Sequence, residues 1–150
     1  MFIAKKRSDA QRQTFRTGLL AAALVLGLSP AHAEPGKLAI EFNDLQPTDK
    51  GCRAVFVVNN GLGKPLEADL RIVAFDKEGH AKLFLSLSVG PLPVNKTRVL
   101  RFDLGEGTDC AGFGRFVLDD VTRCVGPEVK DGECLEALSL SSRAGPSLDF

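Results

Sequence analysis

The sequence lacks an apolar run long enough to cross a lipid bilayer as a helix. Its longest apolar stretch, residues 18–28, is roughly half of the ~20 residues that a membrane span needs. Basic side chains precede this stretch, and the small-residue motif Ala31-His32-Ala33 follows it. This order is typical of a cleavable signal peptide. We therefore expect residues 1–33 to direct export, and the mature protein to be periplasmic or secreted without a membrane span.

The signal contains features of two export routes. Arg12 and Phe15 stand where a twin-arginine signal carries its second arginine and its apolar residue, but Gln11 replaces the first arginine. The general secretory route is therefore favoured, with the twin-arginine route as the alternative. Pro30 supports cleavage, because it ends a helix and leaves the site extended.

The mature part also lacks a dense cluster of basic side chains. The whole chain has 19 basic and 19 acidic residues; the leader holds five of the basic and one of the acidic, so 14 basic and 18 acidic remain, a net charge of −4. Lys96, Arg98 and Arg101 form the one basic group, and their spacing on an expected strand indicates a solvated face. Such a domain is not expected to bind nucleic acid or an anionic membrane.

Closely spaced metal ligands are missing as well. No Cys-x-x-Cys pair occurs, and His80 is the one histidine after the leader. Zinc sites need closely paired thiolates or imidazoles, so no metal or other cofactor is expected. All four cysteines lie in the exported part, and an even number in an oxidising compartment predicts two disulfides. They are Cys52, Cys110, Cys124 and Cys134.

The spacing of the cysteines favours one pairing of the three that are possible. If residues 113–121 form one strand, its ends lie roughly 25 to 30 Å apart, beyond the ~4.4 to 6.8 Å between Cα atoms that a disulfide allows. Cys110–Cys124 is then the least favoured pair. Turn-forming dipeptides, Gly126-Pro127 and Asp131-Gly132, let the chain fold back between Cys124 and Cys134. We therefore predict Cys124–Cys134 and Cys52–Cys110.

Turn-forming residues divide the mature chain into short segments, most of which have strand patterns. Apolar and polar side chains alternate in residues 38–43, 66–74 and 83–89, as in half-buried strands. Residues 52–58 are almost continuously apolar, as in a central strand. Strand patterns recur in residues 98–104 and 116–121. Strands at this spacing, without helices between them, predict an antiparallel β-sandwich over residues 34–143.

The alternation also predicts which side chains face the core. If residues 66–74 and 83–89 are paired strands, one set of side chains points inward and the other set points away. The inward set is Leu70, Ile72, Leu85 and Leu87, and the outward set is Asp69, Arg71, Ser86 and Ser88.

The C-terminal part has a different pattern. Asp131 can cap a helix, and Leu135 and Leu138 recur at helical spacing, so one short helix next to Cys134 is expected. Residues 144–150 carry no pattern and are expected to form a flexible tail, from which Phe150 can dock back.

Several turn motifs follow one another in an order that resembles a known family. They are Asn59-Asn60-Gly61, Phe75-Asp76-Lys77-Glu78-Gly79 at the end of an alternating run, the break at Leu92-Pro93, and a strand ending in Phe102-Asp103-Leu104. This order resembles the immunoglobulin- or fibronectin-like envelope modules of the FxLYD type, over about half of the mature chain. With Gly51-Cys52-Arg53, Gly112-Phe113-Gly114-Arg115 and Asp119-Asp120-Val121, the chain also looks like a group of exported alphaproteobacterial proteins labelled only by a twin-arginine signal. The resemblance implies a location in the envelope and an immunoglobulin-like antiparallel β-sandwich, and no activity.

Motifs for catalysis are missing. His80 lies in an expected turn, and no Gly-x-Ser-x-Gly motif accompanies it. Asp119 and Asp120 are neighbours on an expected strand, so they should point to opposite faces and cannot flank one substrate bond. Gly112-x-Gly114 lacks the third glycine and the helix of a phosphate site, so a bulge or tight turn is expected there.

The sequence therefore favours a binding or accessory module of the bacterial envelope with a protein partner, and not an enzyme. Its binding surface is expected at a sheet edge or on the loop of residues 105–114. The alternative is a small envelope hydrolase, or an inhibitor of an envelope enzyme, that uses Asp109, Asp119 or Asp120. A pocket that gathers two of these carboxylates favours the enzyme, whereas an exposed apolar patch or open strand edge favours the binding module.

Overall fold

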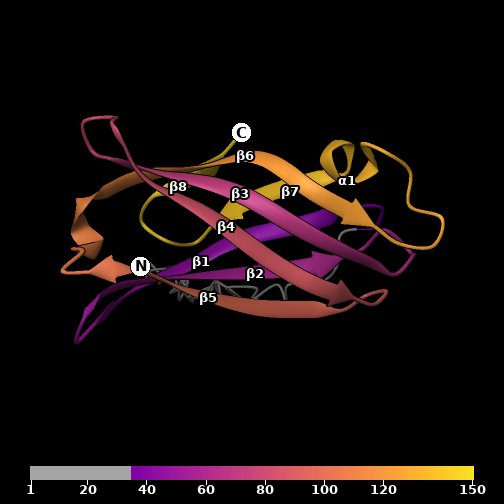
Figure 1. Ribbon diagram of the computed structural model, residues 1–150, viewed down its shortest axis with the longest axis horizontal. Coiled ribbons are helices and arrows are strands. Elements are labelled where there is room, and N and C mark those ends of the chain that lie inside the picture. Colours follow the sequence, from indigo (N-terminus) through magenta and orange to yellow (C-terminus); the bar gives the residue numbers. More distant parts are fainter. Residues whose placement is uncertain (1–34) are drawn as a thin grey trace, which may run out of the picture. The chain divides into compact units, whose positions relative to one another are not determined.

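The computed structural model describes residues 35–150, so the predicted signal peptide lies outside the described residues. The described part is mostly strand, and its strands form two four-stranded sheets that pack face to face (Figure 1). One sheet has the order β5 (Thr97–Glu106), β2 (Gly51–Asn60), β1 (Leu38–Thr48) and β7 (Leu138–Ser142). The other has the order β4 (Ala81–Leu92), β3 (Leu66–Asp76), β6 (Phe113–Val125) and β8 (Ser147–Asp149). The predicted β-sandwich is confirmed.

A group of phenylalanines joins the two sheets in the core. The ring of Phe42 on β1 stacks on that of Phe56 on β2, with centroids 5.0 Å apart, and lies 4.4 Å from the ring of Phe116 on β6. All three side chains are fully buried. Aromatic rings bury large apolar areas and gain further from offset contacts, so this group holds the two sheets together.

The predicted pairing and alternation of β3 and β4 are confirmed. The two strands are antiparallel, with Leu70 opposite Leu87 and Ile72 opposite Leu85. Leu70, Ile72 and Leu87 are buried, whereas Leu85 is half-buried because β4 lies at the edge of its sheet. On the opposite face, the Ser88 hydroxyl donates to the Asp69 carboxylate at 2.7 Å.

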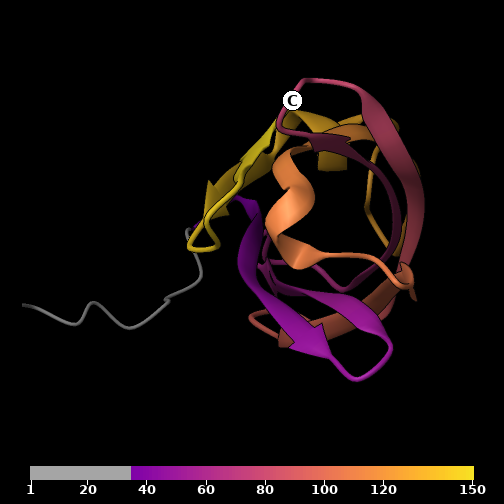
Figure 2. The same cartoon turned by 90° about the vertical axis from the view of Figure 1, so that its left-hand side faces the viewer.

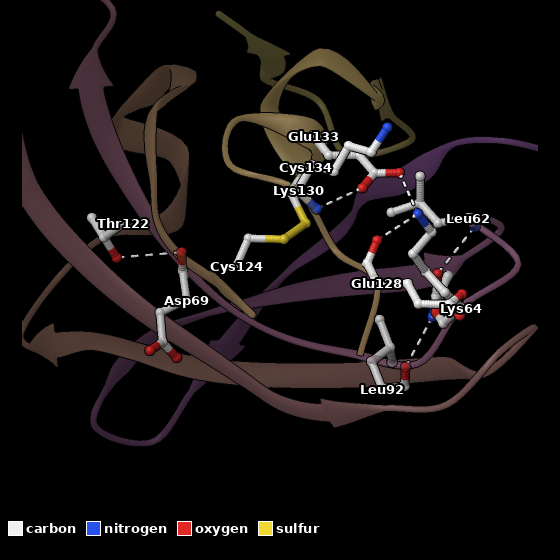
Figure 3. Close-up of a disulfide and its surroundings, with 11 residues drawn as sticks. Leu62, Lys64, Asp69, Leu92, Thr122, Cys124, Glu128, Lys130, Glu133 and Cys134 are labelled. Atoms are coloured by element: carbon white, nitrogen blue, oxygen red, sulfur yellow. Dashed lines mark hydrogen bonds and ion pairs between the residues drawn. A yellow bond between two sulfur atoms is a disulfide. The ribbon is translucent and has the colours of Figure 1, made fainter. Parts of the chain in front are cut away.

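Both predicted disulfides are present. Cys52 on β2 bonds to Cys110, with their Cα atoms 5.1 Å apart, and Cys124 on β6 bonds to Cys134, with their Cα atoms 6.2 Å apart. The second bridge ties the short helix α1 (Glu133–Glu136) to β6 (Figure 3).

An ion pair reinforces the attachment of α1. Lys64 Nζ lies 2.8 Å from Glu133 Oε1 and also donates to the Glu128 carbonyl at 3.0 Å (Figure 3). The other oxygen of Glu133 accepts a hydrogen bond from the Lys130 N–H at 2.9 Å. The Lys130 N–H contributes most to holding the pKa of the Glu133 carboxyl below its usual value, and the hydrogen bond from Lys64 lowers that pKa further.

The expected short helix is present, but its boundaries differ from the prediction. Gly132, in the left-handed conformation, caps α1 without a side-chain hydrogen bond, so the role expected for Asp131 is wrong. Leu138 belongs to β7, which pairs in parallel with β1. This segment pairs with the free edge of β1, because the hydrogen bonds gained along a strand outweigh the weak helical preference of a short segment.

The C-terminal segment expected to be a flexible tail also forms a strand. β8 pairs in parallel with β6, and its central residue Leu148 is buried against the core. Phe150 is 68% exposed and does not dock back. The two parallel pairings of the described chain are both made by these C-terminal strands, whereas the other four pairings are antiparallel.

Candidate functional site

The loop expected to carry the binding surface lies at one end of the sandwich. Its short 3-10 helix η1 (Cys110–Gly112) lies across this end, between the two sheets (Figure 2). The β1–β2 turn and the β3–β4 turn reach the same end (Figure 1). We call these three connections together the η1 end.

Local hydrogen bonds and a disulfide hold η1 in place. The Asp109 side chain caps it and accepts a hydrogen bond from the Ala111 N–H at 3.0 Å. Cys110 is bonded to Cys52, which is buried in β2. The Gly107 N–H donates to the Lys50 carbonyl in the β1–β2 turn at 2.8 Å. The loop is therefore fixed to the sheet at both its start and its helix.

Gly114 is at the point where η1 passes into β6. The pairing of β6 with β3 shifts at this position, because Phe75 lies opposite Arg115 and Asp76 lies opposite Phe113. Gly114 is thus the extra residue of a bulge, as predicted. A Cβ atom on Gly114 would lie 2.8 Å from the Asp76 carbonyl oxygen. Glycine is needed there because the two backbones approach too closely for a side chain.

Three surface grooves open at the η1 end, and η1 residues line two of them. The first, of about 440 Å³, lies beside the β1–β2 turn and includes Lys50, Arg53, Asp103 and Glu106. The second, of about 450 Å³, lies beside the β3–β4 turn and includes Asp76, Glu78, Lys82, Asp109 and Phe113. The third, of about 550 Å³, includes Leu45, Lys77, Ala111, Phe113 and Pro146.

Charged groups in these grooves are held by defined contacts. Arg53 Nε donates to Asp103 Oδ1 at 2.7 Å, and this hydrogen bond holds the pKa of the Asp103 carboxyl below its usual value. Asp76 accepts a hydrogen bond from the His80 N–H at 2.7 Å. That bond, helped by the nearby charges of His80 and Lys82, lowers the pKa of Asp76. The η1 end therefore presents fixed charges of both signs.

The carboxylates considered for catalysis lie in two different places. Asp109 lies in the second groove, whereas Asp119 and Asp120 lie on β6 beside Arg71 of β3. The structure does not bring Asp109 together with either of the other two in that groove.

The expectation that Asp119 and Asp120 point to opposite faces is wrong. Arg71 Nε hydrogen-bonds to Asp119, and Arg71 Nη2 lies 3.6 Å from the Asp120 carboxylate. The pairing of β3 with β6 skips Asp119, because Arg71 lies opposite Asp120 and Ile72 lies opposite Leu118. Such a bulge turns two neighbouring side chains toward the same partner.

His80 lies in the connection between β3 and β4, as expected from the sequence. Its ring Nδ1 is 3.5 Å from the Asp76 carboxylate, and 77% of the side chain is exposed. Within residues 35–150, no three His, Cys, Asp or Glu side chains are arranged to hold a metal ion.

Asn60 has a structural role that the sequence analysis missed. It is fully buried, and its Nδ2 donates to the carbonyl oxygens of Lys64 at 2.8 Å and Leu92 at 2.9 Å. Its Oδ1 accepts from the Leu62 N–H at 3.1 Å. The sequence feature that indicates this role is the Asn60-Gly61 pair, since an Asn side chain often hydrogen-bonds to the backbone two residues further along the chain.

These features define a class, a disulfide-linked β-sandwich with a loop-covered end that carries surface grooves. Comparison of the chain with protein-family models, curated proteins and solved structures found no match. Its function is therefore argued from its own residues.

Proposed function

We propose that this chain is an exported binding module of the bacterial envelope, which docks a protein partner with its η1 end. The observation that carries the proposal is the convergence of three grooves on a loop that a disulfide fixes to β2. A loop held in one conformation loses little entropy on binding, and binding residues are often on loops of a rigid scaffold.

The chemistry of the grooves supports a protein as the partner. Exposed charged residues of both signs, such as Lys77, Glu78 and Asp109, line the same grooves as the more apolar Phe113 and Pro146. Protein interfaces combine an apolar centre with a polar rim. A nucleic acid would instead select a surface with one dominant positive charge.

The location in the envelope is supported by the cysteines and by the expected signal. Both disulfides suit an oxidising compartment. Among the described residues, no helix is both long and apolar enough to cross a membrane. Intact-mass analysis of the protein from the periplasm tests the location, with Glu34 expected as the first residue. A mature form that retains residues 18–28 would contradict it.

A small hydrolase is the second candidate function. The groove beside the β3–β4 turn favours it, because Asp76, Glu78 and Asp109 all line that groove. The lowered pKa of Asp76 keeps its carboxylate ionised, so in such an enzyme it would act as a weak general base and not as a general acid. An inhibitor of an envelope enzyme would use the same end as a docking surface.

Affinity purification from the native host tests the proposed binding. Ala111→Arg places a long side chain on exposed η1, and Val94→Arg places the same side chain on the exposed β4–β5 turn at the other end (Figure 1). We expect wild type and Val94→Arg to capture the same protein, and Ala111→Arg to capture at least tenfold less. Equal capture by the two variants, or no specific capture by wild type, would contradict the proposal.

A further inference from the structure

The edge strands of the sandwich differ in how they are protected from pairing with another strand. Natural proteins protect such edges with charges, prolines, bulges or very short strands. Within residues 35–150, β8 has 3 residues and β7 has 5, three of them serine. β5 carries Arg98, Arg101 and Asp103. The remaining edge strand, β4, has 12 residues.

Bulges stand at both ends of the β4 edge, because its pairing with β3 skips Lys82 and Val89. The regularly paired centre between them, residues 83–88, carries none of these protective features. Residues 83–89 contain no charge, proline or glycine, and Lys82, Gly90 and Pro91 stand at the two ends of this stretch. Phe84, in the stretch, is 74% exposed. A regularly paired, uncharged edge of six residues is a template for strand addition.

Apolar side chains beside this edge are incompletely covered. β4 and β5 meet near the turn that joins them, where Arg98 Nη2 donates to the Pro91 carbonyl at 2.7 Å. Toward the η1 end the two strands separate (Figures 1 and 2). Their inward-facing side chains are half-buried, namely Leu83 and Leu85 of β4 and Leu100 and Phe102 of β5. A further strand along β4 would cover them.

We propose that β4 pairs in antiparallel fashion with β4 of a second copy of this chain, which joins the two β4 sheets across a two-fold axis. Centred on Leu85, this register places Phe84 of one copy opposite Ser86 of the other, a large side chain against a small one. It places Leu83 opposite Leu87 on the inner face. A two-fold interface must be self-complementary, and residues 83–89 meet this condition.

The charges beside β4 favour a second copy over an unrelated strand. In the proposed register, Lys82 lies opposite Ser88, whose hydroxyl donates to the Asp69 carboxylate on β3. Two strand spacings, roughly 10 Å, separate Lys82 from Asp69 of the other copy, a gap that the two side chains can bridge. In the described part of the chain, no cation forms an ion pair with Asp69. Lys82 Nζ lies 3.9 Å from an Asp76 carboxylate oxygen of its own chain, and in the dimer it exchanges this long contact for Asp69 of the other copy.

Sedimentation equilibrium of the full chain, with its disulfides formed, tests the proposal. We expect a dimer with a dissociation constant in the micromolar range, because a single strand pair makes a small interface. Phe84→Glu and Phe84→Lys should each raise that constant at least tenfold, since the two Phe84 positions are diagonal neighbours across the axis. An equimolar mixture of the two variants should recover the dimer. Val99→Glu, at a position 52% exposed on β5, is the matched control and should leave the constant unchanged.

The possible results separate clearly. A monomer at all concentrations, a dimer unaffected by Phe84→Glu, or equal weakening by Val99→Glu would overturn the proposal. Circular dichroism checks that each variant folds, and Ser86→Lys provides a second exposed change on the same edge. The inference does not rest on the proposed partner, although Lys82 and Leu83 also line the second groove of the η1 end. Ala111 belongs to η1 and not to β4. Ala111→Arg should therefore leave the dimer intact.

Discussion

The Nδ2 of Asn60 donates a hydrogen bond to the carbonyl oxygen of Leu92 at 2.9 Å, and so ties the end of β2 in one sheet to the end of β4 in the other. Both residues are buried. The Asn60 backbone adds to this link, because its carbonyl accepts from the Asn95 N–H at 2.8 Å. This one side chain thus fixes the β2–β3 and β4–β5 connections relative to each other.

Replacing Asn60 should therefore destabilise the fold strongly. Asn60→Ala leaves the Leu62 N–H and the Leu92 carbonyl without their partner, and we expect a loss of about 2 to 4 kcal/mol in the free energy of unfolding. Asn59→Ala, which removes an exposed bond to Thr97, should cost less than about 1 kcal/mol. Chemical denaturation measures both. Equal losses at the two positions would contradict the bridging role.

The core alternation of β4 predicts a graded series of stabilities. Leu87 is fully buried, so Leu87→Ala should cost about 2 to 5 kcal/mol. Leu85→Ala should cost less, because Leu85 is half-buried at the sheet edge. Arg71→Ala removes exposed ion pairs and should cost about 1 kcal/mol or less. Thermal melts resolve these differences, and a loss at Ser86→Ala as large as that at Leu87→Ala would show that the two faces are misassigned.

Removal of either disulfide should destabilise the protein, and removal of the one that closes the longer loop should cost more. Cys52 and Cys110 are 58 residues apart in sequence, and Cys124 and Cys134 are 10 apart. On the chain-entropy relation, replacing the first pair by alanine should cost about 4.2 kcal/mol and replacing the second about 2.7 kcal/mol. Urea denaturation of the two double variants gives the order. Non-reducing peptide mapping checks the pairing, and a Cys110–Cys124 peptide would refute it.

Acid should weaken the β3–β4 turn through Asp76. The His80 N–H lowers the pKa of Asp76 in the folded protein, whereas an unfolded aspartate has a pKa of about 3.9. A lowered folded pKa gives stability that is complete above the unfolded pKa and is lost as pH falls through the folded pKa. The stability advantage of wild type over Asp76→Asn should thus be constant near neutral pH and shrink below about pH 4. An advantage that grew on acidification would contradict this assignment.

Long patterned segments explain why the sandwich could be predicted. The alternation in residues 66–74 and 83–89 fixes which face is buried, since a shift of one residue would turn every leucine to solvent. The disulfide pairing followed from the same strands, because a strand through Phe116 keeps Cys110 away from Cys124.

Short and irregular features could not be predicted in this way. β7 and β8 have few residues, and each forms because a free edge of β1 or β6 is available in the folded chain. The bulge at Asp119 depends on the register with β3, which no local pattern encodes. The η1 loop was expected to carry function, but the grooves around it are formed by turns distant in sequence.

Site-specific photo-crosslinking in the native host tests the proposed binding surface most directly. A photoreactive amino acid at Ala111 lies on exposed η1, and the same amino acid at Val94 lies on the exposed turn at the opposite end. We predict a covalent adduct with one envelope protein from position 111 and none from position 94. Absence of an adduct at position 111, or equal adducts at both positions, would contradict the proposal that the η1 end binds a partner.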